Sequence, residues 1–148
     1  MLFKFNTVIA QNGQFIDFSI AQRNLQFIYQ TEADFENPKM TSDAFTLDIR
    51  AKSRRLLISA RTISNLNSGL TTVPNNLFSI QLSGTNANIN SGFTGLYNLD
   101  FTDQTILMYG ERGNKKAFFD YDLHVAEIGY DYDPGQYFYS IIFTVTEQ

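Results

Sequence analysis

The chain has 148 residues, no cysteine, a net charge of −4 and a hydrophobic fraction of 43%. This length suits one domain with a substantial core, and the lack of cysteine excludes disulfides and thiolate metal ligands. The negative net charge, without a basic stripe, argues against nucleic-acid binding. No apolar run approaches the roughly 20 residues of a membrane-spanning helix.

The first ten residues allow two interpretations. Alternation of Leu2, Lys4, Asn6 and Val8 with their neighbours is typical of a short N-terminal strand. Val8 and Ala10 also stand at the −3 and −1 positions of a signal-peptidase site before Gln11. Residues 1–10 are therefore expected to be either a strand or the remnant of a signal peptide. Residues 11–148 are expected to form a single β-sandwich domain.

Alternation of apolar and polar residues predicts strands along most of the remaining chain. The first such segment is residues 15–20, in which Ile16, Phe18 and Ile20 share a face. One helical turn is expected over residues 31–35. The later alternating sets are Leu25, Phe27 and Tyr29; Phe45, Leu47, Ile49 and Ala51; Leu56, Ile58 and Ala60; Phe78, Ile80 and Leu82; Ile106, Met108 and Gly110; and Phe119, Tyr121, Leu123 and Val125.

The final strand follows the turn at Pro134 and Gly135 and alternates to the end of the sequence. Short strands separated by turn-rich segments predict an all-β fold, a two-sheet antiparallel β-sandwich of immunoglobulin-like or pilin-like type. The residues expected in the core are Leu47, Ile49, Ile58, Ile80, Leu123, Ile141 and Phe143.

Catalytic signatures are weak. His124 is the only histidine, and it shares a strand face with Asp120 and Asp122. A Ser–His–Asp site needs a nucleophile in contact with the histidine, and the sequence has no Gly-x-Ser-x-Gly elbow. We therefore expect a solvent-facing histidine, no catalytic residue, no cofactor and no enzymatic activity. The basic residues Lys52, Arg54 and Arg55 are expected to form a charged turn that protects a sheet edge.

Four residues in one turn are candidates for ligand binding: Tyr130, Asp131, Tyr132 and Asp133. Carboxylates at this spacing could bind Ca²⁺, and aromatic rings beside carboxylates suit a carbohydrate. The spacing does not match an EF-hand loop, so no metal ligand is assigned. Tyrosines also pack well at the edge of a sandwich, with the ring buried and the hydroxyl in water.

Three stretches of the sequence, residues 25–37, 45–60 and 132–148, resemble a broad group of secreted β-sandwich surface proteins of Bacteroidetes-type bacteria. This group is similar to spore coat U-like proteins and fimbrial subunits. In it, a turn with Pro-Gly-x-Tyr introduces a closing strand that ends near Thr-x-Thr, as in Pro134–Tyr137 and Thr144–Thr146 here.

The resemblance implies an exported, non-enzymatic, structural or adhesive subunit of the cell surface. Its expected partners are copies of itself or surface-assembly proteins, through strand exchange between subunits. The strand-pairing candidates are Ile16, Phe18 and Ile20, for which pairing within the chain is the favoured alternative. Two other functions stay open: a carbohydrate- or Ca²⁺-binding module, with a glycan as partner, and a virion surface protein.

Overall fold

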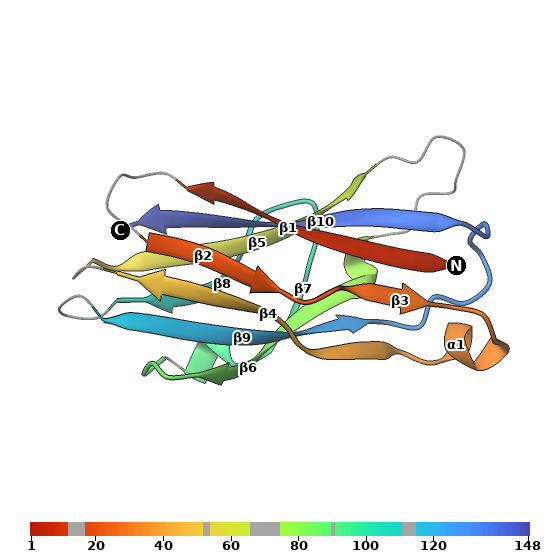
Figure 1. Cartoon of the computed structure of the whole chain (residues 1–148), viewed down its shortest axis with the longest axis horizontal. Helices are drawn as coiled ribbons and strands as arrows, with labels where there is room; N and C mark the ends of the chain where they lie inside the picture. Colours follow the sequence, from red (N-terminus) through yellow and green to blue (C-terminus); the bar gives the residue numbers. More distant parts are fainter. Residues whose placement is uncertain (12–16, 52–53, 66–74, 90, 111–114) are drawn as a thin grey trace.

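The protein is a sandwich of two β-sheets, as Figure 1 shows. Each sheet has five strands. The computed structural model describes residues 1–11, 17–51, 54–65, 75–89, 91–110 and 115–148. Sheet A has the order β3 (Gln26–Ile28), β1 (Leu2–Gln11), β10 (Gln136–Glu147), β5 (Leu56–Asn65) and β8 (Gln104–Tyr109). Sheet B has the order β2 (Asp17–Gln22), β4 (Lys39–Arg50), β9 (Lys116–Val125), β6 (Phe78–Thr85) and β7 (Leu96–Asn98).

Helical structure among the described residues is limited to short segments. These are α1 (Glu32–Glu36), within a residue of the predicted turn, and two 3₁₀ turns, η1 (Asn75–Leu77) and η2 (Ser91–Phe93). None of these helices has the length and apolar character needed to cross a membrane. The predicted all-β sandwich is confirmed.

The strand order is that of a jelly roll. If β2 and β3 are left out, the other eight strands can be renumbered 1 to 8 along the chain. The strand order is then 1-8-3-6 in sheet A and 2-7-4-5 in sheet B. This differs from the immunoglobulin-like order expected above, in which one sheet reads 1-2-5-4. One pair departs from an antiparallel jelly roll: β1 and β10 pair in parallel, whereas the other pairs of described strands are antiparallel. Alternation defines which face of a strand is buried, but it does not define the neighbouring strand.

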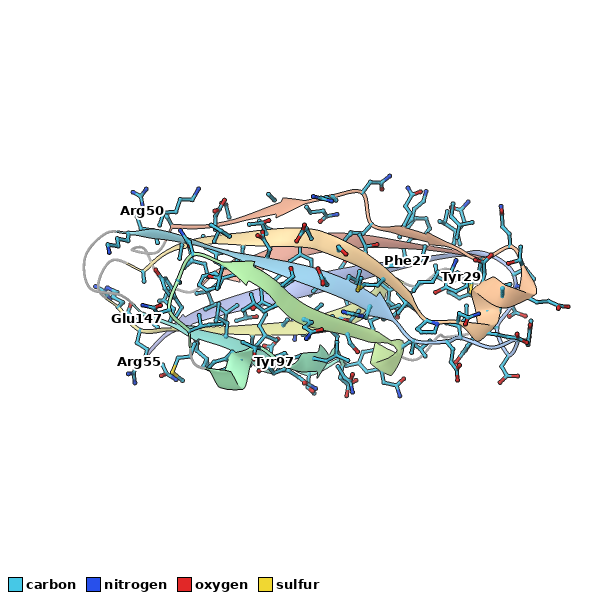
Figure 2. The ribbon with its side chains drawn as sticks, turned by 90° about the horizontal axis from the view of Figure 1, so that it is seen from below. Phe27, Tyr29, Arg50, Arg55, Tyr97 and Glu147 are labelled. Atoms are coloured by element: carbon cyan, nitrogen blue, oxygen red, sulfur yellow. The ribbon has the colours of Figure 1, made fainter. Side chains whose placement is uncertain are left out.

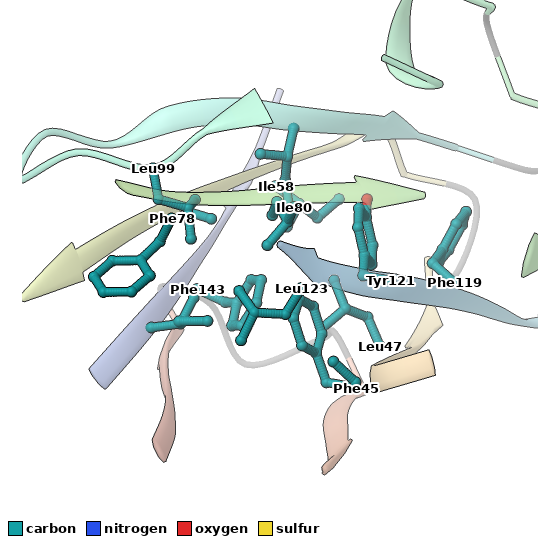
Figure 3. Packing of buried hydrophobic residues seen from close by; sticks show 14 of the residues in the cluster. Phe45, Leu47, Ile58, Phe78, Ile80, Leu99, Phe119, Tyr121, Leu123 and Phe143 are labelled. Carbon is teal, nitrogen blue, oxygen red and sulfur yellow. The ribbon is translucent and has the colours of Figure 1, made fainter. Parts of the chain in front are cut away.

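The core lies between the inner faces of the two sheets, as the close-up in Figure 3 shows. All seven residues predicted for the core are fully buried. Aromatic rings connect the sheets: Phe45 of sheet B stacks on Tyr121 at 5.4 Å and meets Phe143 of sheet A at 5.1 Å between ring centroids. The closing strand β10 buries Tyr137, Tyr139, Ile141, Phe143 and Val145, as its alternation predicted.

Strand β8 departs from the predicted face of Ile106, Met108 and Gly110. In the structure Ile106, Leu107 and Tyr109 are buried, whereas Met108 is half-buried. The cause is a register shift opposite Ile58 and Ser59, which pair with Leu107 and Thr105 and leave Ile106 as an extra residue. A bulge of this kind reverses the alternation of a strand, so the prediction for this face was wrong.

The segment predicted to pair by alternation, residues 15–20, overlaps the edge strand β2. Phe18 and Ile20 are half-buried and pack against the core, and β2 pairs antiparallel with β4 of the same chain. Ile16 lies outside the described residues, as does Lys52. The first strand, β1, lies inside sheet A between β3 and β10.

Candidate functional sites at the two ends of the sandwich

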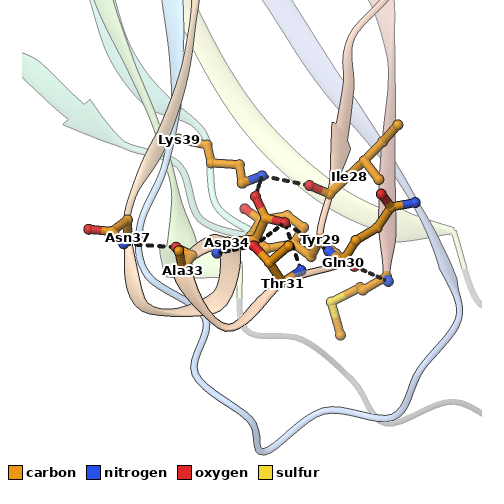
Figure 4. Close-up of polar contacts among 9 residues, drawn as sticks. Ile28, Tyr29, Gln30, Thr31, Ala33, Asp34, Asn37 and Lys39 are labelled. Atoms are coloured by element: carbon orange, nitrogen blue, oxygen red, sulfur yellow. Dashed lines mark hydrogen bonds and ion pairs between the residues drawn. The ribbon is translucent and has the colours of Figure 1, made fainter.

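The short helix α1 is held at one end of the sandwich by a cluster of polar contacts around Asp34, drawn in Figure 4. Thr31 caps the helix, and the N–H groups of Gln30 and Thr31 each donate to Asp34 Oδ2 at 2.9 Å. Lys39 Nζ donates to Asp34 Oδ1 and to the carbonyl of Ile28, both at 2.6 Å. The hydrogen bond from Lys39, followed by those from Gln30 and Thr31, holds the pKa of Asp34 well below its usual range.

Tyr29 completes this cluster beneath the lysine. Lys39 Nζ lies 4.5 Å from the centroid of the Tyr29 ring, a cation–π contact. Burial raises the pKa of Tyr29, and the charge of Asp34 adds to the effect. Lys39 thus bonds a carboxylate and a carbonyl and covers an aromatic ring. This arrangement anchors α1 to β3 and β4 and leaves Lys39 poorly placed to act as a nucleophile.

Tyr130 is the candidate ligand residue that the structure brings to this helix. Gly129 adopts a φ of +61°, and its N–H donates to the carbonyl of Phe35 at 3.1 Å. The Tyr130 ring stacks on Phe35 at 5.5 Å, and its hydroxyl donates to Glu36 Oε1 at 3.1 Å. With 60% of its surface exposed, Tyr130 presents an aromatic ring to solvent beside a carboxylate.

The other three candidates follow Tyr130 directly in the chain. Asp131 and Asp133 are exposed, whereas Tyr132 is half-buried against the core. The carbonyl of Asp133 accepts a hydrogen bond of 2.7 Å from the hydroxyl of the buried Tyr137. Within the described ranges, no group of three or more histidine, aspartate or glutamate side chains is placed to hold a metal ion.

His124 lies on the outer face of sheet B, opposite Met40 and Ser79. Its Nε2 is inaccessible and has no hydrogen-bond partner in the described part of the chain. The aspartates on the same face are used in the sheet itself: Asp120 accepts from Thr46 Oγ1 at 2.5 Å, and Asp122 accepts from the N–H of Asp43 at 2.9 Å. Asp43 has a φ of 47° within a β4 bulge, so Asp122 stabilises that bulge.

A hollow of about 400 Å³ lies on the outer face of sheet B, where β2, β4 and β9 run side by side. Figure 2 shows Arg50, which lines it, at the opposite end of the long axis from Tyr29. Its volume falls in the range of small-molecule sites, roughly 300–1,000 Å³. The residues that line it are Asp17, Phe18, Ser19, Asp48, Ile49, Arg50 and Lys116.

The charges of this hollow alternate in sign. Arg50 pairs with Asp17 of β2 on one side and with Lys116 of β9 on the other. The chain neighbours Ile49 and Ala117 point into the core. Because side chains alternate along a strand, Arg50 and Lys116 point outward. Arg50 Nη1 is 3.7 Å from Asp17 Oδ2, and Lys116 Nζ is 3.3 Å from Asp48 Oδ2. No local sequence pattern predicts this site. Alternation does show that Asp48 and Arg50 face outward, but only the register of β2 and β9 brings Asp17 and Lys116 beside them.

The chain matches no protein-family model and no curated protein. The resemblance to spore coat U-like and fimbrial proteins therefore stays a prediction.

Proposed function

We propose that the protein is a non-enzymatic structural subunit of the cell surface, and that copies of it associate by pairing along the edge of β2. The observation that carries the proposal is the difference among the edge strands of the described sheets. β3 and β7 have three residues each, and β8 contains a bulge. β2 runs six residues in regular register with β4. Natural proteins protect edges by short strands, bulges, lysine or proline, and β2 has none of these.

The hydrogen-bonding direction of β2 supports the same association. The N–H of Arg23 donates to the carbonyl of Ala44 at 3.1 Å, one step beyond the β2–β4 register. In an antiparallel ladder, alternate residues bond the same neighbour. The backbone groups of Ser19 therefore point to β4, and those of Phe18 and Ile20 point to the open edge. The β2 strand of a second copy would pair with these groups about a two-fold axis. The B sheets of the two copies would then form one continuous sheet.

The surface location is supported by composition. Charged residues form only 18% of the chain, below the roughly 25% of average globular proteins. Asn, Gln, Ser and Thr supply much of the polar surface, a pattern common in secreted all-β proteins. Labelling of intact native cells with a membrane-impermeant reagent tests this location. Labelling only after lysis would contradict it.

The association is tested by analytical ultracentrifugation of the purified protein over a range of concentrations. The wild type is expected to associate as concentration rises. Ile20→Pro removes an N–H at the open edge and leaves the ladder to β4 intact, so this variant is expected to be monomeric. Ala21→Lys places like charges near each other across the paired edge and is expected to have the same effect.

Two controls separate edge pairing from loss of fold. Thr105→Lys adds the same charge to the edge strand β8 and is expected to leave the association unchanged. Ser19→Pro removes an N–H that bonds β4, so it is expected to lower the melting temperature. A wild-type protein that stays monomeric at millimolar concentration would refute the proposed pairing.

A further inference from the structure

The hollow on the outer face of sheet B contains Arg50, whose side chain is partly exposed and whose buried Nε has no hydrogen-bond partner among the described residues. In the described part of the chain, the Arg50 guanidinium makes no hydrogen bond, because its 3.7 Å contact with Asp17 is beyond hydrogen-bonding distance. The Arg50 side chain is 39% exposed. The planar fork of a guanidinium fits a carboxylate through two parallel hydrogen bonds. One position of the hollow therefore suits a ligand carboxylate.

The next pair of cross-strand partners in the hollow, Ser19 and Asp48, suits the hydroxyl groups of a ligand. Ser19 of β2 pairs directly with Asp48 of β4, and the Asp48 side chain is 26% exposed, less than the other charged side chains of the hollow. Asp48 is contacted by Lys116 on one oxygen, and an ionised carboxylate has about four acceptor positions. It can therefore accept hydrogen bonds from ligand hydroxyls, and the Ser19 hydroxyl can donate or accept beside it.

The third cross-strand partner beside Ser19 and Asp48 is an aromatic residue of β9, Phe118. Phe118 pairs with Asp48 across β4 and β9, and its neighbours Ala117 and Phe119 are buried. The Phe118 ring is therefore on the outer face, where it is 37% exposed. An exposed ring beside hydroxyl-binding groups offers an apolar surface to the C–H face of a sugar.

We propose that this hollow binds an acidic sugar, a hexuronic acid residue of an acidic polysaccharide. The carboxylate bonds Arg50, the ring hydroxyls bond Asp48 and Ser19, and the sugar ring lies toward Phe118. The two cations and two carboxylates of the hollow sum to zero charge. A ligand with one negative charge and several hydroxyls suits this balance. A phosphate carries about −1.5 to −2 charges at neutral pH, and Asp17 and Asp48 would repel it.

Calorimetric titration with tetragalacturonate at low ionic strength tests the proposal. Arg50→Gln is expected to weaken binding at least tenfold. Asp17→Asn is expected to strengthen it severalfold, because the competing carboxylate beside Arg50 is removed. This increase in affinity cannot come from a damaged fold. Arg55→Gln, which removes an exposed arginine at the same end of the sandwich, is the matched control and is expected to leave the affinity unchanged.

Three results would overturn the proposal. The first is no heat of binding with the wild type at millimolar tetragalacturonate. The second is equal loss of affinity in Arg50→Gln and Arg55→Gln, which would indicate general charge attraction. The third is binding of neutral tetragalactose or of inorganic phosphate as tight as that of the uronate, because the carboxylate would then not be what the hollow recognises.

Discussion

Truncation of Phe143 to alanine tests the register of the whole sandwich. Phe143 is fully buried in β10, and its ring centroid lies 5.1 Å from that of Phe45 in the opposite sheet. Full burial of a phenylalanine side chain contributes about 1.5–3 kcal/mol, and the cavity left behind raises the expected loss to about 3–5 kcal/mol. For a domain of this size, the melting temperature should fall by roughly 6–20 °C.

The measurement is urea denaturation of the wild type and the variant, followed by circular dichroism and fluorescence. Phe101→Ala is the matched control, because Phe101 is 55% exposed and its removal should change the free energy of unfolding by less than about 1 kcal/mol. If Phe143→Ala costs less than about 1 kcal/mol, the inward face of β10 has been assigned to the wrong residues.

Three further predictions follow from single features of the structure. Far-UV circular dichroism should show less than about a tenth helix, against roughly a third in average globular proteins, and a higher value would contradict the fold. Gly110→Ala should destabilise the protein by about 1–3 kcal/mol, because an added Cβ would lie 3.0 Å from the carbonyl oxygen of Arg54; Gly95→Ala, with nothing within 4 Å, is the control. The pKa of Asp34 is lowered from its ordinary value of 3.8, so its contribution to stability is present above about pH 4 and is lost as the pH falls through the folded-state pKa. In thermal melts from about pH 5 to about pH 2, Asp34→Asn should therefore show a smaller loss of stability than the wild type, and parallel curves would refute this role.

The sequence alone determined which face of most strands is buried. The alternation of Leu47 and Ile49 in β4, or of Ile141 and Phe143 in β10, is a local property that depends on the two-residue period of a strand. The start of α1 is also a local property, since Thr31 and Asp34 form a capping box without help from the rest of the fold. These features can be predicted from the sequence alone, because each depends on residues only a few positions apart.

Only the tertiary structure decided which strands are neighbours and in which register. The parallel pairing of β1 with β10 joins the two ends of the described chain, and no local pattern encodes a contact at that separation. The bulge at Ile106 depends on the partner strand β5, so alternation within β8 gave the wrong face. The hollow arises in the same way. Asp17, Arg50 and Lys116 come from three distant segments, and they meet because hydrophobic burial on the inner face of sheet B sets the register that aligns their polar neighbours outside.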